Sequence, residues 1–188
     1  LYYHSDSNSD MSVTSTLKHF FRRAKLQFYI FTASDYTDAY ARFMDDRMET
    51  DPQMAVGEFN GMGQGQFDYL VSRGLEDNDT LLEIGCGIFR AGEHFIEYLD
   101  RENYIGLEIS EETIQTGLRR LDRELVERKQ PAVHNNNDLK FKEVNGKVEF
   151  IIAHSVFSHT PREVISECFE NVGDIMHDTT EFYFTFFD

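Results

Sequence analysis

The sequence predicts an α/β protein in which a doubly wound, mainly parallel β-sheet follows a section of helices. The first observation behind this prediction is that short apolar runs alternate with amphipathic segments from residue 80 onward. That alternation is typical of strands joined by right-handed helical crossovers. The second is that residues 15–79 show helical spacing of apolar side chains. The third is length, because 188 residues suit one α/β domain.

The N-terminal section is predicted to be helical and to pack on the sheet. Residues 1–14 are polar and rich in turn formers, so we expect a flexible leader there. Helices are then expected over residues 15–31, 35–47 and 66–73. Pro52 and four glycines up to Gly65 predict a loop before the third helix, which Gly74 ends. Most aromatic side chains of residues 15–79 are expected in the core, although some could line the mouth of a substrate site.

Residues 80–188 are predicted to form the sheet and the helices that cover it. Strands are expected over residues 80–85, 104–110, 132–135, 147–153 and 181–187. Helices are expected over residues 91–98, 111–129 and 162–176. A parallel sheet is covered on both faces, which explains why its strands consist of apolar runs rather than alternating patterns.

The chain is strongly acidic, with 34 Asp and Glu against 18 Lys and Arg and a formal net charge of −16. Such a charge repels nucleic-acid phosphates, so we expect no nucleic-acid partner. Six lysines against twelve arginines, together with the excess of carboxylates, resemble the composition of proteins from salt-loving organisms. The alternative is an ordinary acidic cytosolic protein.

The two cysteines, Cys86 and Cys168, form neither a disulfide framework nor a metal-binding spacing. The histidines are scattered without a ligand motif, so we expect no metal site. No apolar run reaches the ~20 residues that a membrane-spanning helix needs, and no signal peptide is visible. The sequence therefore predicts a reduced, cytoplasmic protein without a membrane partner.

The strongest local signal is the segment EIGCG at residues 83–87, between the first strand of the sheet and the helix that follows. Gly85 and Gly87 allow a sharp turn and a close approach of the backbone to a ligand. The helix directs its N-terminal N–H groups toward the same place. Glu108 ends the second strand, where a carboxylate can accept hydrogen bonds from ribose hydroxyls. Together these features predict a cofactor that contains a nucleoside.

A dinucleotide suits this segment poorly. Dinucleotide-binding loops follow the pattern G-x-G-x-x-G, but Arg90 stands at the third glycine position. A pyrophosphate would also lie close to the carboxylate of Glu83. S-adenosylmethionine suits the segment better, because it carries a sulfonium and an α-amino group and no phosphate.

Residues 81–110, LLEIGCGIFRAGEHFIEYLDRENYIGLEIS, resemble the first two motifs of the class I S-adenosylmethionine-dependent methyltransferases. The resemblance is closest to a bacterial and archaeal subgroup whose first loop reads G-C-G-x-[LF]-R-x-G. FIIAHSVFSHTP at residues 150–161 resembles the strand-four motif of that subgroup, and AVGEFNGMGQGQFDYLVSRGL at residues 55–75 resembles its lead-in. The resemblance covers residues 54–188 and implies a Rossmann-like sheet with strand order 3-2-1-4-5.

The resemblance also implies which residues bind S-adenosylmethionine and its product S-adenosylhomocysteine. Gly85, Cys86 and Gly87 would pass beneath the methionine part, and Glu83 would face its amino group. Apart from the resemblance, Arg90 is a candidate to hold a carboxylate of the cofactor or of the substrate or to pair with Glu93, and the alternative is a surface residue at the start of the helix. The other candidates are Glu108 at the ribose, Ile109 at the adenine, Asn137, Asp138 and Leu139 at the adenine edge, and His154 and Ser155 beside the transferred methyl group.

Three features depart from the pattern of the family, and one of them is the turn MHDTTEF at residues 176–182, which lacks the Gly-Gly expected before the fifth strand. Phe89 replaces the usual third glycine of the first loop, although the subgroup tolerates a bulky residue there. The sequence also ends at Asp188, directly after the fifth strand of a plan that has seven. Residues 80–188 are therefore expected to be either a C-terminally truncated core or a core with an exposed edge strand, and such an apolar edge favours a homodimer.

The resemblance implies a methyltransferase that acts on a small-molecule or carbohydrate-like acceptor. His154 and His159 are the candidate catalytic bases, because an oxygen or nitrogen acceptor must lose a proton. The alternative is a methyltransferase-like module that binds the cofactor without catalysis. A nicotinamide-dependent dehydrogenase is the third hypothesis, which Arg90 and Glu83 disfavour.

Overall fold

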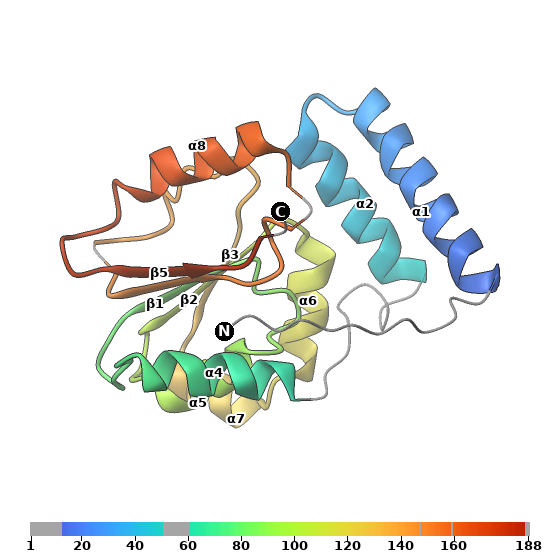
Figure 1. The fold of residues 1–188 in the computed structure, drawn as a ribbon. Helices are drawn as coiled ribbons and strands as arrows, with labels where there is room; N and C mark the ends of the chain where they lie inside the picture. The colour runs from blue at the N-terminus through green and yellow to red at the C-terminus, as the bar shows by residue number, and fades with distance from the viewer. Residues whose placement is uncertain (1–12, 51–60, 147, 159, 187–188) are drawn as a thin grey trace.

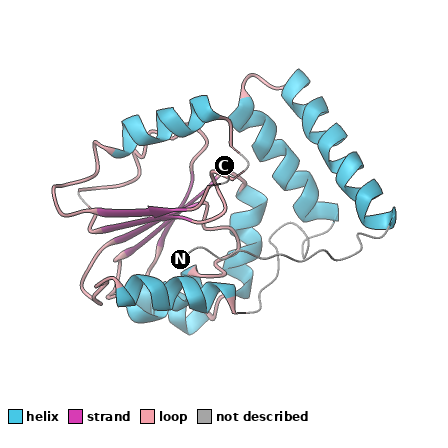
Figure 2. Cartoon of the chain, in the orientation of Figure 1, coloured by secondary structure: helices cyan, strands magenta, loops and turns pink. Residues whose placement is uncertain are grey.

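A computed structural model describes the chain at residues 13–50, 61–146, 148–158 and 160–186. Within these residues, five parallel strands form one sheet in the order β3-β2-β1-β4-β5 (Figures 1 and 2). The strands are β1 (Leu81–Ile84), β2 (Tyr104–Glu108), β3 (Ala132–Asn135), β4 (Phe150–Ala153) and β5 (Glu181–Phe184). The Rossmann-like fold class and the strand order that the sequence predicted are thus confirmed.

Helices cover both faces of the sheet. They are α1 (Val13–Thr32), α2 (Tyr36–Thr50), α4 (Met62–Ser72), α5 (Gly92–Tyr98), α6 (Glu111–Arg120), α7 (Arg123–Lys129) and α8 (Arg162–Val172). In Figure 1, α4, α5 and α7 lie on one side of the sheet and α8 lies on the other, while α2 lies beside α6 and carries α1 on its outer side. One apolar core packs under α4 and α5, and a second lies between the sheet and α8. Among the described helices, none is long and apolar enough to cross a membrane.

The strand register brings the carboxyl ends of the central strands to one edge. Glu83 of β1 is paired with Gly106 of β2 and with Ile152 of β4. Glu108, the last residue of β2, is paired with Asn135 of β3. Ligands of open parallel sheets bind outside such an edge, next to the point where the strand order reverses. In this sheet that point lies between β1 and β4.

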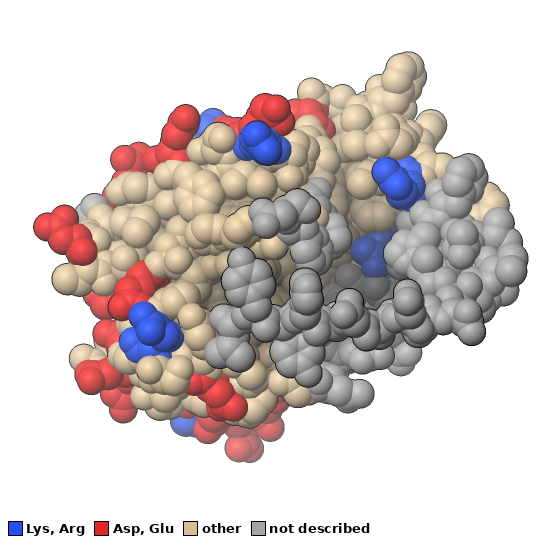
Figure 3. All heavy atoms as spheres, in the orientation of Figure 1, with Lys and Arg blue, Asp and Glu red and all other residues tan. Residues whose placement is uncertain are grey.

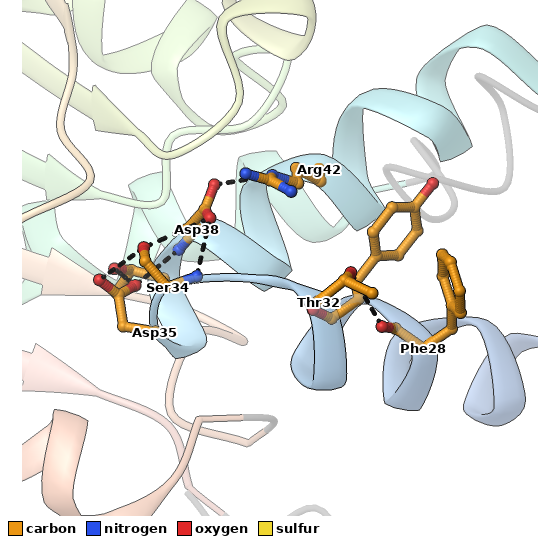
Figure 4. Close-up of polar contacts among 8 residues, drawn as sticks. Phe28, Thr32, Ser34, Asp35, Asp38 and Arg42 are labelled. Atoms are coloured by element: carbon orange, nitrogen blue, oxygen red, sulfur yellow. Dashed lines mark hydrogen bonds and ion pairs between the residues drawn. The ribbon is translucent and has the colours of Figure 1, made fainter.

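The turn between α1 and α2 is fixed by carboxylates (Figure 4). Asp35 accepts hydrogen bonds from the backbone N–H of Asp38 (2.9 Å) and from the hydroxyl of Thr37 (2.7 Å), so it caps the N-terminus of α2. Asp38 in turn accepts from the backbone N–H of Ser34 at 3.2 Å and from Nε of Arg42 at 2.8 Å. The sequence thus ends one helix and begins the next within three residues.

The predicted helix over residues 111–129 is wrong as a single element, because it forms two helices, α6 and α7. Leu121 takes an extended conformation after α6, and the carboxylate of Asp122 accepts hydrogen bonds from the backbone N–H groups of Glu124 (2.7 Å) and Leu125 (3.2 Å). A side chain that caps a new helix competes with continuation of the old one. The apolar periodicity of the sequence therefore continues through residues 121 and 122, although the Asp122 cap ends one helix and begins another there.

The predicted loop before the third helix is also shorter than expected. Its residues 52–60 lie outside the described residues, but α4 already begins at Met62, after Gly61 in a left-handed conformation with φ +75°. Gly63 is helical for a packing reason, because a Cβ atom at this position would lie 1.9 Å from the carbonyl oxygen of Arg90. The glycine that suggested a loop is therefore the contact point between α4 and the segment after β1.

Several other boundaries also differ by a few residues, among them the end of α2 at Thr50 and the end of β2 at Glu108. Most of the leader predicted at residues 1–14 lies outside the described residues, and α1 already begins at Val13. The strand predicted over residues 147–153 begins at Phe150, and α8 ends at Val172. Strand β5 ends at Phe184 rather than at residue 187. These differences leave the architecture unchanged.

Candidate functional site

A cavity of about 480 Å³ opens at the carboxyl edge of the sheet, beside β1, β2 and β4. It is lined by these residues that the sequence singled out: Glu83, Gly85, Cys86, Gly87, Arg90, Glu108, Ile109, Asn137, Leu139, His154 and Ser155. Asp138 is not among the lining residues, and its carboxylate lies near the ammonium groups of Lys140 and Lys142. His159 lies outside the described residues. The structure thus brings predicted site residues from the loops after β1, β2, β3 and β4 to one cavity.

The loop after β1 turns through two glycines with positive φ, Gly85 at +73° and Gly87 at +57°. The backbone N–H groups of Gly85 and Cys86 both donate to the carbonyl of Leu107 on β2, at 2.7 and 3.0 Å, which fixes the turn against the sheet. A Cβ atom at Gly85 would lie 2.5 Å from Cγ2 of Val156. A Cβ atom at Gly87 would meet nothing within 4 Å, so that glycine leaves open space at the wall of the cavity.

Phe89 occupies the position of the missing third glycine and takes the left-handed conformation that a glycine would take, with φ +63°. A side chain in this region is costly, by about 1–3 kcal/mol, unless its surroundings hold it there. The ring of Phe89 is fully buried and lies against α6 at Gly117, where a Cβ atom would come within 2.7 Å of the ring. Burial of the aromatic ring therefore compensates for the strained backbone and anchors the loop.

Glu108 is buried, with 7% of its surface exposed, and its carboxylate closes the loop from the other side. One oxygen accepts from the backbone N–H of Gly87 at 3.0 Å, and the other accepts from Ile109 (2.9 Å) and Ser110 (3.2 Å). Burial raises the pKa of Glu108, while the three N–H donors act in the opposite direction. The carboxylate is thus fixed in position at the wall of the cavity.

Glu83 is the second buried carboxylate of the cavity, with 5% of its surface exposed. The hydroxyl of Tyr104 donates a hydrogen bond of 2.6 Å to it. Burial raises the pKa of Glu83 to about 7, although the Tyr104 hydrogen bond and the charge of Arg90 lower it. A carboxyl group with such a pKa accepts a cationic ligand by losing its proton near neutral pH.

Arg90 and His154 lie close enough for their charges to interact. Burial lowers the pKa of His154, and the charge of Arg90 lowers it further, so the imidazole is neutral at pH 7. Ser155 places its hydroxyl 3.1 Å from Nδ1 of His154 and has φ +61°. The strained turn after β4 is held by the residue that follows β5, because the backbone N–H of Ser155 donates to the hydroxyl of Thr185 at 2.7 Å. His154 therefore has the protonation state of a base at the edge of the cavity.

The segment after β3 contributes a residue that the sequence analysis missed. Asn136 is buried, lines the cavity and accepts a hydrogen bond from the backbone N–H of Leu139 at 3.2 Å. Its amide nitrogen donates to Glu143 at 3.0 Å. Leu139 itself has φ +52°. Asn136 thus shapes the loop that holds Asn137 and Leu139 at the cavity, and its position next to the end of β3 was the available signal.

Helices α2 and α4 supply a wall of the cavity. The sequence analysis expected some aromatic side chains of residues 15–79 at a substrate site but did not identify which residues they are. The lining residues on these helices are Tyr36, Thr37, Tyr40, Met44, Arg47, Met62 and Gln66. Positions 36, 40, 44 and 47 lie on one face of α2 by helical spacing. That spacing was visible in the sequence, but a helix face packed in a core and a helix face at a cavity have the same periodicity.

Comparison with known families supports the methyltransferase family that the sequence resembles. A family model described as a methyltransferase domain matches residues 82–181, which is more than half of the chain. No protein of curated function gives a significant match. Solved structures of methyltransferases share the fold at low sequence identity.

Three of these structures illustrate the likeness. Magnesium protoporphyrin IX methyltransferase (ChlM) of Synechocystis PCC 6803, with bound S-adenosylhomocysteine, is 18% identical and has a TM-score of 0.51, over 85% of this chain and 63% of that one. An S-adenosylmethionine-dependent methyltransferase of Clostridium acetobutylicum ATCC 824 is 15% identical, with a TM-score of 0.51, over 77% and 55%. Phosphoethanolamine N-methyltransferase 1 of Haemonchus contortus, in complex with phosphoethanolamine and S-adenosylhomocysteine, is 15% identical, with a TM-score of 0.57, over 75% and 30%.

The present sequence therefore spans less than two thirds of each of these three structures. At such low identity these structures show the likeness of the fold alone. The family model covers the strands and strand-end loops that line the cavity. The chain belongs to the class I methyltransferases, the family whose cofactor is S-adenosylmethionine.

Proposed function

We propose that the chain transfers the methyl group of S-adenosylmethionine to a small-molecule or carbohydrate-like acceptor. The observation that carries this proposal is the single cavity shared by the glycine loop, two buried carboxylates and a wall of helix side chains. Its volume of about 480 Å³ lies within the range of about 300–1,000 Å³ that is usual for small-molecule sites. The strand-end loops would hold the cofactor, and the helix wall would face the acceptor.

The residues around the glycine loop fit the cofactor. The open space above Gly87 is what a backbone needs to approach a ligand closely, and only glycine leaves it. Glu108 is held beside this space by three backbone N–H groups, so its carboxylate can accept from a pair of ribose hydroxyls without moving. Both features support a nucleoside at the end of β2.

The other end of the cavity fits an amino acid. Glu83 carries the negative charge that an α-ammonium group requires, and Arg90 carries the positive charge that a carboxylate requires. The two side chains interact with each other, so they form a complementary pair for a zwitterion. S-adenosylmethionine supplies an electrophilic methyl group when it is bound, which leaves the protein to position the acceptor and remove its proton.

His154 is the candidate for that proton transfer within the described residues. It lines the cavity, is neutral at pH 7 and has Ser155 beside Nδ1, which leaves Nε2 as the candidate acceptor of a proton. His159 stays a second candidate from the sequence alone. We expect His154→Gln to lower kcat while the affinity for S-adenosylhomocysteine stays within about threefold, because the side chain lies outside the glycine loop.

Titration calorimetry with S-adenosylhomocysteine and with NAD tests the proposal. We expect S-adenosylhomocysteine to bind, NAD not to bind, and Glu108→Gln to weaken binding by at least about tenfold, since a hydrogen bond to a charged group contributes about 1.5–3 kcal/mol. Glu111→Gln, an exposed carboxylate three residues later, is the matched control. Binding of NAD alone would contradict the proposal.

A second measurement separates the enzyme from a module that only binds the cofactor. The protein is incubated with cofactor that carries a labelled methyl group and with a pool of cellular small molecules. Transfer of label that depends on the protein supports the enzyme. Tight binding of S-adenosylhomocysteine without any transfer would support the non-catalytic module instead.

The oligomeric state and location are part of the same proposal. Strand β5 lies at the outer edge of the described sheet, and Phe184 and Phe186 are 41% and 61% exposed there, so a second copy could pair along it. Light scattering should then give twice the monomer mass, and replacing Phe184 by Lys should restore the monomer. The buried free thiols of Cys86 and Cys168 are consistent with a reducing compartment such as the cytoplasm.

A further inference from the structure

The cationic side chains of helix α2 are sorted between two faces. The helix contains four carboxylates, Asp38, Asp45, Asp46 and Glu49, and none of them lines the described cavity. Arg47 does line it, whereas Arg42 lies outside it and pairs with Asp38 at 2.8 Å. In a chain with a net charge of −16, this arrangement places a positive charge on the helix side of the cavity, where none of the described lining residues is a carboxylate.

The remaining polar groups of this wall are mainly hydrogen-bond donors. Burial raises the pKa of Tyr36 to about 12, and burial together with the charge of Glu108 raises that of Tyr40, although Arg47 lowers it, so both phenols keep their protons. Their rings stack on each other with centroids 5.8 Å apart. The side-chain nitrogen of Gln66 is buried without a hydrogen-bond partner among the described residues. A buried donor without an acceptor costs about 1–3 kcal/mol, which an acceptor atom of a ligand would recover.

The contacts of Arg47 include two neutral groups. Its guanidinium lies over the ring of Phe43, 5.5 Å from the centroid, and one nitrogen is 3.8 Å from the sulfur of Met44. These contacts hold the side chain along α2, at the face that lines the cavity. A guanidinium has five N–H donors, so it can add an anion to the contacts that it already makes.

From this arrangement we propose that the methyl acceptor carries an anionic group, a carboxylate or a phosphate, which binds Arg47 with Gln66 and the two tyrosines as further donors. The inference rests on the proposed methyltransferase function and specifies its substrate class. The net charge of the whole molecule is a further argument for a specific anion site. Asp and Glu gather along the margins of the face in Figure 3, so an anion is repelled by the surface in general and needs a local cationic site.

The first test uses inorganic phosphate as the probe. Protein saturated with S-adenosylhomocysteine is titrated with phosphate, and the Tm is compared with that in chloride of equal ionic strength. We expect phosphate to raise the Tm above the chloride value in the wild type and in Arg42→Gln, and the difference to disappear in Arg47→Gln. Arg42 is the matched control, because it lies on the same helix but outside the cavity. Equal effects of phosphate and chloride on the wild type would overturn the inference.

The second test uses an extract of small molecules as the source of acceptor. The extract is passed over an anion-exchange resin before protein and labelled cofactor are added. We expect this step to remove at least nine tenths of the methyl transfer, and undiminished transfer would overturn the inference. Treating the extract with a phosphatase then distinguishes the anions, because loss of transfer indicates a phosphate monoester and retention indicates a carboxylate or a phosphate diester.

The affinity for S-adenosylhomocysteine separates failure of this inference from failure of the proposed function. Arg47→Gln should bind S-adenosylhomocysteine within about twofold of the wild type while its methyl transfer to the anionic fraction falls at least tenfold. A wild type that does not bind S-adenosylhomocysteine would refute the function itself. A wild type that binds it and methylates only neutral or cationic molecules would refute the anionic acceptor alone.

Discussion

The cavity has two walls that are built differently. On the strand side, the backbone of the glycine loop and the buried carboxylates of Glu83 and Glu108 are fixed by hydrogen bonds to neighbouring strands and loops. On the helix side, long side chains of α2 and α4, such as Tyr40 and Gln66, form the surface. A wall of fixed backbone suits a ligand that never changes, whereas a wall of side chains can be altered without disturbing the sheet. The cofactor and the acceptor would divide along this boundary.

The largest effect should come from adding one methyl group to the strand wall. We expect Gly87→Ala to weaken S-adenosylhomocysteine binding by about 100-fold, or about 2.7 kcal/mol, because its Cβ atom would enter the open space at the loop. Gly146→Ala is the matched control, because Gly146 also has positive φ (+94°) and also has no atom within 4 Å of its Cβ position, but it lies outside the cavity. Calorimetry and thermal unfolding measure both variants.

Comparing these two variants separates the effect on cofactor affinity from the effect of backbone strain on stability. Both should lose about 1–2 kcal/mol of stability, the usual cost of a side chain in the left-handed region. Only Gly87→Ala should lose affinity. Equal affinity in the two variants would show that the cofactor does not pass over the loop, and the division of the cavity into two walls would lose its main support.

A smaller effect should come from pH. The raised pKa of Glu83, about 7, falls when a cationic ammonium group binds beside it, so binding releases a proton below pH 7. Affinity for S-adenosylhomocysteine should therefore be constant above about pH 7 and fall by up to about tenfold for each pH unit below it. Calorimetry between pH 5.5 and 8.5, a range chosen around that value, measures the profile.

Two variants identify the group that titrates. Glu83→Gln should bind more weakly and show a flat profile. Tyr104→Phe removes a hydrogen bond that lowers the pKa of Glu83, so the midpoint should move to higher pH. A profile that keeps its midpoint in Tyr104→Phe would assign the titration to another group, such as Glu108 or His154.

The strand wall could be predicted from the sequence because its residues have fixed places relative to the strands. Gly85, Gly87 and Glu108 follow the ends of apolar runs, and parallel strands bring such ends to one edge whatever the rest of the sequence is. The strand order, in contrast, was predicted only from the resemblance to the family, since alternation of strands and helices is compatible with several orders.

The individual residues of the helix wall could not be predicted, and the reason is physical. Tyr40 and Met44 repeat at the spacing of any buried helix face, and the pattern contains no information about what lies opposite. Gly63 gave a misleading signal, because a glycine that lets α4 approach Arg90 looks the same in the sequence as a glycine that breaks a helix. Asp122 shows a related limit, since its cap divides a helix whose periodicity continues.

The smallest effect should come from the contact that joins the two walls. The hydroxyl of Ser110, in the loop after Glu108, donates a hydrogen bond of 2.6 Å to Asp45 on α2. Removing it with Asp45→Ala should loosen α2, raise hydrogen exchange there and lower affinity for S-adenosylhomocysteine by about threefold, because Tyr40 lines the cavity only while α2 is docked. Asp46→Ala is the control, since it removes a partly exposed ion pair with Lys25 that contributes about 0–1 kcal/mol.

If both variants behave alike, the walls are independent, and the acceptor side can change without any cost to cofactor binding. If only Asp45→Ala loses affinity, acceptor binding on α2 and cofactor binding at Glu108 must be coupled, because each stabilises the same docked position of the helix.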